Sequence, residues 1–212
     1  MLLAFDTATP LVTVALHDGD QVVVELTAER AMKHAEQLAP LIEQALDRAG
    51  IVRQDVTAIA VGVGPGPFTG LRVGLVTART LGYALDVPVY GVCSLDVLAV
   101  EAVATGAVSG DFVVATDARR KEVYLASYDE QGGRLDGPAV ARPADVATDA
   151  PVVGPGADLY PDAFPHRVGP SAPSAGWLAR AVAEELAELG DPEPLYLRRP
   201  DAEAAHAPKR VS

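Results

Sequence analysis

The sequence predicts an α/β protein of two lobes, in which one strand-rich pattern occurs twice. The chain opens with three strand-like runs, and helical and strand-like segments then alternate as far as residue 104. A similar apolar run that ends in Asp begins again 111 residues further on. With 212 residues, 49% of them hydrophobic, the chain can bury the core of one large domain or of two lobes of about 100 residues each.

The first three elements are expected to form an antiparallel meander. Period-2 and all-apolar runs cover Leu2 to Asp6, Val12 to His17 and Val22 to Thr27, and turn-forming residues separate them. The expected elements that follow, in chain order, are a helix over Lys33 to Ala49 that Gly50 ends, a strand over Thr57 to Val63, a helix over Gly70 to Asp86, a strand over Val89 to Val92 and a helix over Ser94 to Ala104.

The second lobe begins as a copy of the first. Leu2 to Asp18 aligns without gaps on Val113 to Asp129, and five of these seventeen positions are identical, Asp6 with Asp117 among them. Both copies contain an apolar strand that ends in Asp, a polar turn and a returning strand. Five identities can also arise between two unrelated hairpins, so the alignment favours a duplication without excluding chance.

The remainder of the second lobe is less regular. Residues 132–176 are rich in Gly, Pro, Ala and Asp and predict only short strands. An amphipathic helix is then expected over Ser174 to Leu189, a last strand over Leu195 to Arg198 and a flexible tail from Pro200. The sequence therefore divides into an N-terminal lobe at 1–104, a C-terminal lobe at 105–199 and a tail at 200–212.

Net charge and cysteine content indicate the compartment of the protein and argue against binding to nucleic acid. A formal net charge of −12 opposes binding to nucleic acid, because Lys and Arg must neutralise the phosphates. Cys93 is the only cysteine, so an internal disulfide is excluded and a reducing compartment is favoured. No stretch approaches the roughly 18 apolar residues of a membrane span. We expect a cytoplasmic protein without a membrane partner.

A glycine-rich turn over Gly62 to Arg72 is the strongest local motif. It follows a strand and precedes a helix, which is where phosphate-binding loops occur. It lacks the lysine and the spacing of a Walker loop, and Pro65 and Pro67 remove two backbone N–H donors. The competing interpretation, which we favour, is a rigid turn in which Thr69 caps the next helix.

Small residues form a ridge along the helix that follows this turn. Gly70, Gly74, Ala78 and Gly82 recur every four residues and therefore lie on one face. Helical glycines cost about 0.5 to 1 kcal/mol each, so another backbone is expected to approach closely. Packing inside the lobe explains this, and so does a helix-to-helix partner interface. The residues predicted for that interface are Leu38, Leu41, Ile42, Ala45, Leu71, Gly74, Leu75, Ala78 and Gly82.

Residues that could support catalysis are few. The four histidines have no metal-ligand spacing, and no serine lies in a nucleophile elbow, so we predict no catalytic residue and no metal site. Asp6 and Asp117 end equivalent strands and are weak candidates for holding the magnesium of a nucleotide between the lobes. The alternative is that each carboxylate caps the turn after its strand. We expect no cofactor.

Five motifs, taken in order, resemble the TsaB (YeaZ-like) family. They are Leu3-Ala-Phe-Asp-Thr-Ala-Thr, His34-Ala-Glu-Gln-Leu-Ala-Pro, Gly64-Pro-Gly-Pro-Phe-Thr-Gly-Leu-Arg, Asp117-Ala-Arg-Arg-Lys-Glu-Val-Tyr and Leu195-Tyr-Leu-Arg. The residues of the family-motif turn are Gly64, Gly66, Thr69, Gly70 and Arg72. The resemblance implies the actin-like, Hsp70-like and sugar-kinase-like (ASKHA) fold, with two lobes on a duplicated mixed-sheet core. It also implies action in tRNA threonylcarbamoyladenosine (t6A) synthesis beside the paralogue TsaD and the ATPase TsaE.

The chain differs from TsaD at the positions of the metal-binding residues. TsaD-type enzymes follow the strand equivalent to Val89–Val92 with a metal-binding Asn-His-x-x-x-His stretch, whereas Cys93, Ser94 and Leu98 stand here. Ser94 and Leu98 cannot replace two imidazoles on a metal. Pro67, where the family more often has a small polar residue, further weakens nucleotide binding. The resemblance therefore implies a non-catalytic scaffold or activator of TsaD.

Two other functions stay open from the sequence. One is a small actin-like ATPase or kinase that uses Asp6 and Asp117, and the other is a metallopeptidase, which the ligand count disfavours. For the scaffold, we expect a heterodimer with TsaD, cooperation with TsaE, a homodimer when the chain is alone, and no strong direct binding of tRNA.

Overall fold

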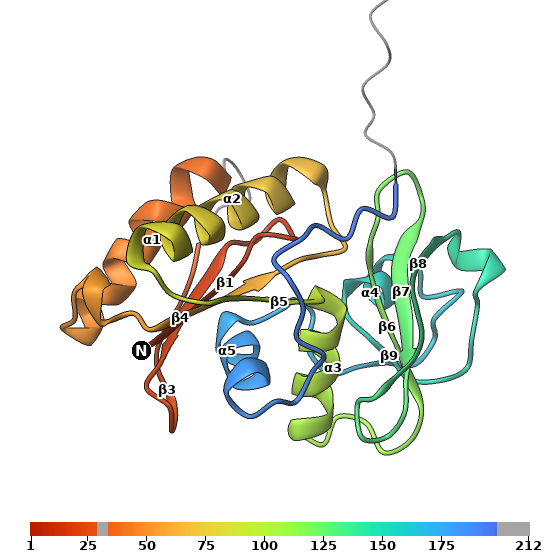
Figure 1. Ribbon diagram of the computed structural model, residues 1–212. Coiled ribbons are helices and arrows are strands. Elements are labelled where there is room, and N and C mark those ends of the chain that lie inside the picture. Colours follow the sequence, from red (N-terminus) through yellow and green to blue (C-terminus); the bar gives the residue numbers. More distant parts are fainter. Residues whose placement is uncertain (29–33, 199–212) are drawn as a thin grey trace, which may run out of the picture.

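The computed structural model describes residues 1–28 and 34–198, which form two β-sheets with helices around and between them (Figure 1). The first sheet has the order β3-β2-β1-β4-β5. Its first three strands form the predicted antiparallel meander, and β4 and β5 are added in parallel. The strands are β1 (Leu2–Asp6), β2 (Thr13–His17), β3 (Val22–Thr27), β4 (Ala58–Gly62) and β5 (Val89–Val92).

The second sheet repeats this topology. Its order, β8-β7-β6-β9-β10, is equivalent strand by strand to that of the first, and the parallel and antiparallel pairs match. The predicted duplication and the reduced second lobe are confirmed, because β9 and β10 have two residues each. The strands are β6 (Phe112–Asp117), β7 (Val123–Tyr128), β8 (Arg134–Ala141), β9 (Val152–Val153) and β10 (Arg167–Val168).

The helices connect equivalent strands in the two lobes. In the first lobe α1 (His34–Ala49) and α2 (Phe68–Leu85) cover one face of the sheet. In the second lobe a short 3-10 helix, η2 (Pro143–Asp145), stands in place of α1, and α4 (Pro155–Leu159) stands in place of α2. The apolar periodicity of α1 and α2 buries one large cluster against β1, β2 and β4.

The third helix of each half packs on the sheet of the other half. Helix α3 (Ser94–Ala104) contacts β6, β7 and β9, whereas α5 (Ala175–Ala183) contacts β1, β2 and β3. The two helices also contact each other between the sheets. Eight of the eleven residues of α3 are buried, which explains why most of this segment is apolar. The division at residue 105 stays a prediction, since helices are exchanged across it.

Several elements differ from those predicted. Helix α2 begins at Phe68, so Thr69 lies within its first turn and makes no cap. Helix α5 ends at Ala183, not Leu189, because Glu185 adopts a left-handed backbone conformation with φ of 54°. Strand β8 was missed, because Gly137 and Pro138 lie in its middle and both residues are uncommon inside strands. Residues 195–198 form no strand; Pro194 precedes them. The predicted tail from Pro200 lies outside the described residues.

The segment after α5 contacts both lobes. Gly190 pairs with Gly91 through two backbone hydrogen bonds of 2.8 and 2.9 Å, and the Leu195 N–H donates to the Val63 carbonyl at 2.9 Å. Further on, the Arg198 guanidinium donates to the Ala118 carbonyl at 2.6 Å. The segment therefore ties β5 and the glycine-rich turn to the turn between β6 and β7. Within 1–28 and 34–198, no helix combines the length and apolarity needed to cross a membrane.

A half-buried carboxylate on α3 gives a pH-dependent stability. Burial, followed by the nearby charge of Glu25, raises the pKa of Glu101 to about 7, and its Oε2 is buried without a hydrogen-bond partner among the described residues. Because this folded-state pKa lies above the ordinary value of 4.5, ionisation of Glu101 lowers stability as the pH rises through this interval.

We expect Glu101→Gln to raise the melting temperature at pH 8.5, since it removes the buried charge. The gain should shrink as the pH falls through 7 and should vanish near pH 4.5, where the wild-type side chain is protonated. Thermal unfolding across this pH series measures it. The exposed Glu43→Gln on α1 is the matched control, and an equal gain for both variants at every pH would contradict the prediction.

Candidate functional site

The candidate site lies where β1, β4 and β5 of the first sheet end beside the start of α3. Asp6 ends β1 and is 2% exposed. Its Oδ1 accepts a hydrogen bond from the Ala8 N–H at 2.6 Å, and its Oδ2 accepts one from the Ser94 hydroxyl at 2.6 Å. Asp6 therefore caps its own turn and anchors α3. This geometry agrees with the turn-capping interpretation of Asp6 and not with a role as a magnesium ligand.

Ser94 connects this carboxylate to the glycine-rich turn. Its Oγ accepts a hydrogen bond from the Gly64 N–H at 3.3 Å, and its own N–H donates to the Gly64 carbonyl at 2.8 Å. One short side chain thus joins the ends of β1 and β4 to the first turn of α3. Leu98, one helical turn later, is fully buried against Phe112 and Tyr128 of the second sheet.

The glycines of the turn are required by close packing. A Cβ at Gly62 would overlap Asp6 Oδ2, and a Cβ at Gly66 would overlap the Ala8 carbonyl oxygen. Gly64 has φ of 94°, and its bond to Pro65 is cis. The N–H groups of Val63 and Gly64 are already bonded, to the Val92 carbonyl and to Ser94. This geometry favours the rigid-turn interpretation over a phosphate-binding loop.

Asp117, the equivalent of Asp6, is fixed by the turn of the second lobe. It ends β6 and is half-buried. Its Oδ1 accepts a hydrogen bond from the Arg119 N–H at 2.7 Å, and its Oδ2 lies 3.5 Å from the Arg119 guanidinium. Each carboxylate is thus held by a turn of its own half. Among the residues that the structure describes, no three His, Cys, Asp or Glu side chains are grouped to hold a metal ion.

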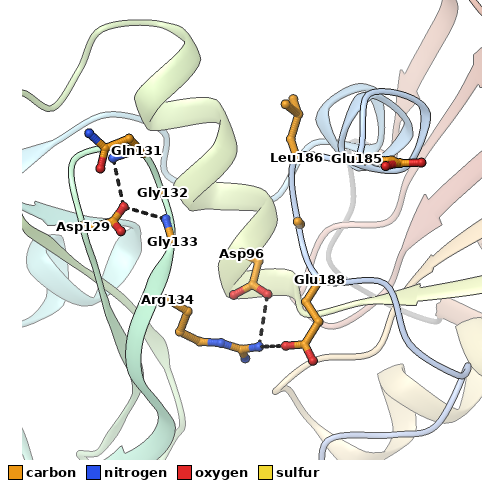
Figure 2. A pocket seen from close by; sticks show the side chains of 10 residues that line it. Asp96, Asp129, Gln131, Gly132, Gly133, Arg134, Glu185, Leu186 and Glu188 are labelled. Atoms are coloured by element: carbon orange, nitrogen blue, oxygen red, sulfur yellow. Dashed lines mark hydrogen bonds and ion pairs between the residues drawn. The ribbon is translucent and has the colours of Figure 1, made fainter.

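A second polar cluster, which sequence reasoning missed, lies two residues beyond Ser94. Figure 2 shows a pocket of about 470 Å³ between α3, the turn from β7 to β8 and the segment after α5. Asp96 on α3 accepts a hydrogen bond from the Tyr128 hydroxyl at 2.7 Å and lies 3.6 Å from Arg134. Arg134 also pairs with Glu188 at 2.7 Å, so the cluster joins three segments. An acidic residue at position 96 of a largely apolar segment was the sequence signal for a polar partner, but it does not identify Tyr128, Arg134 or Glu188.

Burial raises the pKa values of the ionisable groups in and beside this cluster, Cys93 among them, and so disfavours a nucleophilic role. Burial raises the pKa of Asp96, although Tyr128 and Arg134 act against this shift. Burial and the charge of Asp96 raise the pKa of Cys93 to about 12, so its thiol stays protonated near neutral pH. Burial also raises the pKa of Tyr128. Since a thiol reacts as its thiolate, Cys93 is inert as a nucleophile.

The predicted interface ridge faces inward, which corrects the sequence-based placement. A Cβ at Gly74 would overlap Thr7 Oγ1 of the first lobe, and a Cβ at Gly82 would overlap Val89 of β5. The close approach that the ridge requires is therefore made by the sheet and its connections. Of the residues predicted for the interface, Leu41 is half-buried, and Leu38, Ile42, Ala45, Leu71, Gly74, Leu75, Ala78 and Gly82 are buried within the monomer.

The opposite face of α2 is exposed and partly apolar. Val76 is 61% exposed and Tyr83 is 93% exposed, and their spacing of seven residues places them on one side of the helix. Arg72, predicted as part of the family-motif turn, lies on this same side, with its guanidinium 3.9 Å from the centre of the Phe68 ring. Arg79 continues the stripe and pairs with Glu193 at 3.0 Å. Thr69 and Gly70 lie in the first turn of α2, where Gly70 is buried.

Two sheets of one mixed order, joined by exchanged helices, define a two-lobed protein of the ASKHA class. The family model described as TsaD, tRNA N6-adenosine threonylcarbamoyltransferase, matches residues 23–161. YeaZ from Pseudomonas aeruginosa aligns with a TM-score of 0.74 and 34% identity, over 92% of this chain and 99% of that one. The chain therefore belongs to the TsaB (YeaZ-like) proteins and matches the TsaD family model over most of its length.

Further relatives agree with this membership. An uncharacterised protein of Mycobacterium tuberculosis is 46% identical over 211 residues, which is 95% of this chain and 93% of that protein. The tRNA threonylcarbamoyladenosine biosynthesis protein TsaB of Bacillus subtilis is 34% identical over 136 residues, 64% of this chain and 58% of TsaB. A second Pseudomonas aeruginosa structure, described as similar to the peptidase YeaZ, has a TM-score of 0.78 at 32% identity, over 93% of this chain and 99% of that one.

Proposed function

We propose that this chain is a non-catalytic scaffold or activator of TsaD in threonylcarbamoyl transfer to the tRNA adenosine next to the anticodon. The observation that carries the proposal is the structural use of Ser94 and Leu98. The resemblance implies metal-binding histidines at these positions in TsaD. Here Ser94 bonds to Asp6 and Gly64, and Leu98 fills the core beside the second sheet. The names of the TsaB relatives supply the pathway.

The closed surroundings of Asp6 support this proposal over an ATPase or kinase. A magnesium ion would have to compete with the Ser94 hydroxyl and the Ala8 N–H for the Asp6 carboxylate, which is 2% exposed. Asp117 is engaged by Arg119 in its own turn. The inert Cys93 thiol likewise gives no support to a peptidase that uses a cysteine nucleophile.

The exposed stripe of α2 is the proposed association surface. Val76 and Tyr83 present apolar and aromatic area to solvent, which is the composition found at the centres of protein interfaces. The helices α1 and α2 thus remain the expected docking elements for TsaD, through the face opposite to the buried ridge. The same patch on a second copy would give the two-fold homodimer expected when TsaD is absent. In the cytoplasm, TsaE would act with the resulting heterodimer.

We expect Val76→Arg to weaken binding to TsaD at least tenfold, about 1.4 kcal/mol or more, because a charge would be buried at the centre of the interface. Formation of t6A in a reaction reconstituted from TsaD, TsaE and this chain should fall in parallel at limiting protein. Calorimetric titration measures the affinity, and labelled threonine incorporation into tRNA measures the product.

Val52→Arg is the matched control, since Val52 is 60% exposed and lies outside α1 and α2. It should bind TsaD as the wild type does, and both variants should melt normally. Equal affinity of Val76→Arg and the wild type would remove α2 from the interface. Undiminished t6A formation when this chain is omitted would refute the scaffold function itself.

A further inference from the structure

Basic side chains gather at one turn of an otherwise acidic chain. The protein has 29 Asp and Glu residues against 17 Lys and Arg, yet Arg119, Arg120 and Lys121 are consecutive between β6 and β7, and all three are exposed. Arg142 follows Ala141, the register partner of Val123, and lines the same groove as Lys121. The cluster lies on the second lobe, so it is separate from the exposed stripe of α2.

The backbone of this turn is strained. Arg119, Arg120 and Lys121 have φ angles of 62°, 54° and 61°, a left-handed conformation that glycine adopts freely and other residues adopt at a cost. The conformation is held by a hydrogen bond from the Glu122 N–H to the Arg119 carbonyl at 3.0 Å and by the contact of Arg198 with Ala118. Strained non-glycine residues that surrounding contacts hold in place occur often at binding sites.

An apolar groove begins directly beside these charges. It encloses about 590 Å³ between Lys121, the segment from Arg142 to Ala147 and the segment from Leu159 to Ala163. Leu159 is 52% exposed at its wall. Asp162 is the one acidic residue among those that line it, against Lys121 and Arg142. The groove therefore combines exposed apolar area with a cationic edge.

We propose that this groove binds a short acidic segment of a partner protein that carries one large apolar side chain. The apolar side chain would enter beside Leu159, and the flanking carboxylates would face Lys121 and Arg142. Charge complementarity selects this occupant, since the edge is cationic on an acidic surface. RNA fits less well, because the groove wall is apolar and the chain has a net charge of −12. The inference does not depend on the proposed role beside TsaD.

Peptide display on the full chain tests the proposal. Selection should enrich peptides with Asp or Glu on both sides of Leu, Phe or Trp, and the enriched peptides, labelled with fluorescein, should bind in an anisotropy titration. The double variant Lys121→Gln, Arg142→Gln should weaken their binding at least tenfold, and Leu159→Ser should do the same. Added salt should weaken binding to the wild type more than to the double variant.

Arg53→Glu, an exposed charge reversal on the first lobe, is the control and should leave peptide binding unchanged. Failure to enrich such peptides, or equal binding by the wild type and both groove variants, would overturn the proposal. A single-stranded RNA oligonucleotide that binds in place of the peptides and is lost in the double variant would also overturn it. So would self-association that both groove variants abolish, because the occupant would then be a second copy.

Discussion

Replacing Gly62 by Ala is expected to lower the free energy of unfolding by about 2 to 4 kcal/mol. The new Cβ would overlap the Asp6 carboxylate, which cannot move without losing its hydrogen bonds from Ser94 and Ala8. The cost combines overpacking with the loss of charge-assisted hydrogen bonds at a buried group. Urea unfolding measures the change.

A double-mutant cycle identifies the cause of this loss. Asp6→Ala should destabilise the protein alone, because it leaves the Ser94 hydroxyl and the Ala8 N–H without their acceptor. In the double variant Gly62→Ala, Asp6→Ala, the added methyl group occupies the space of the removed carboxylate, so the combined loss should be smaller than the sum of the two. Gly110→Ala is the control, since its Cβ would meet nothing within 4 Å. Strict additivity would show that the two residues are not coupled.

Enlarging Ala78 to Leu should destabilise the monomer by about 1 to 3 kcal/mol through overpacking. Ala78 is fully buried on the face of α2 that packs against β4. Thermal melting measures the fold, and sedimentation measures association. Thr80→Leu places the same side chain at an exposed position of the helix and should leave the melting temperature nearly unchanged. A normal melt of Ala78→Leu with lost association would return the ridge to the partner interface.

Local periodicity was sufficient for most of the first lobe. The meander, the alternating helices and strands up to Ala104 and the restart at β6 all follow from spacing and turn residues. Spacing alone could not identify the neighbour of the ridge on α2. A four-residue repeat of small residues requires a close approach, but the same repeat serves a sheet within the monomer and a helix on a partner. The structure places Thr7 and Val89 there.

Part of the candidate site could also be predicted from the sequence, and part could not. That Asp6 and Asp117 cap their turns could be stated from their positions after strands, since an Asp bonds readily to backbone groups two residues on. The cluster of Asp96, Tyr128, Arg134 and Glu188 could not be predicted, because it joins segments whose approach depends on the exchange of α3 between the lobes. Strand β8 carries Arg134 and was not predicted, because Gly137 and Pro138 lie in its middle.

The exchange of α3 and α5 between the lobes has a consequence for synthesis on the ribosome. The first sheet is complete once β5 has been made, but α5, which covers one of its faces, is finished about ninety residues later. At 5 to 20 residues per second, this face waits roughly 5 to 18 seconds for its cover. The nascent N-terminal half is thus an incomplete folding unit that exposes apolar strand surface during this interval.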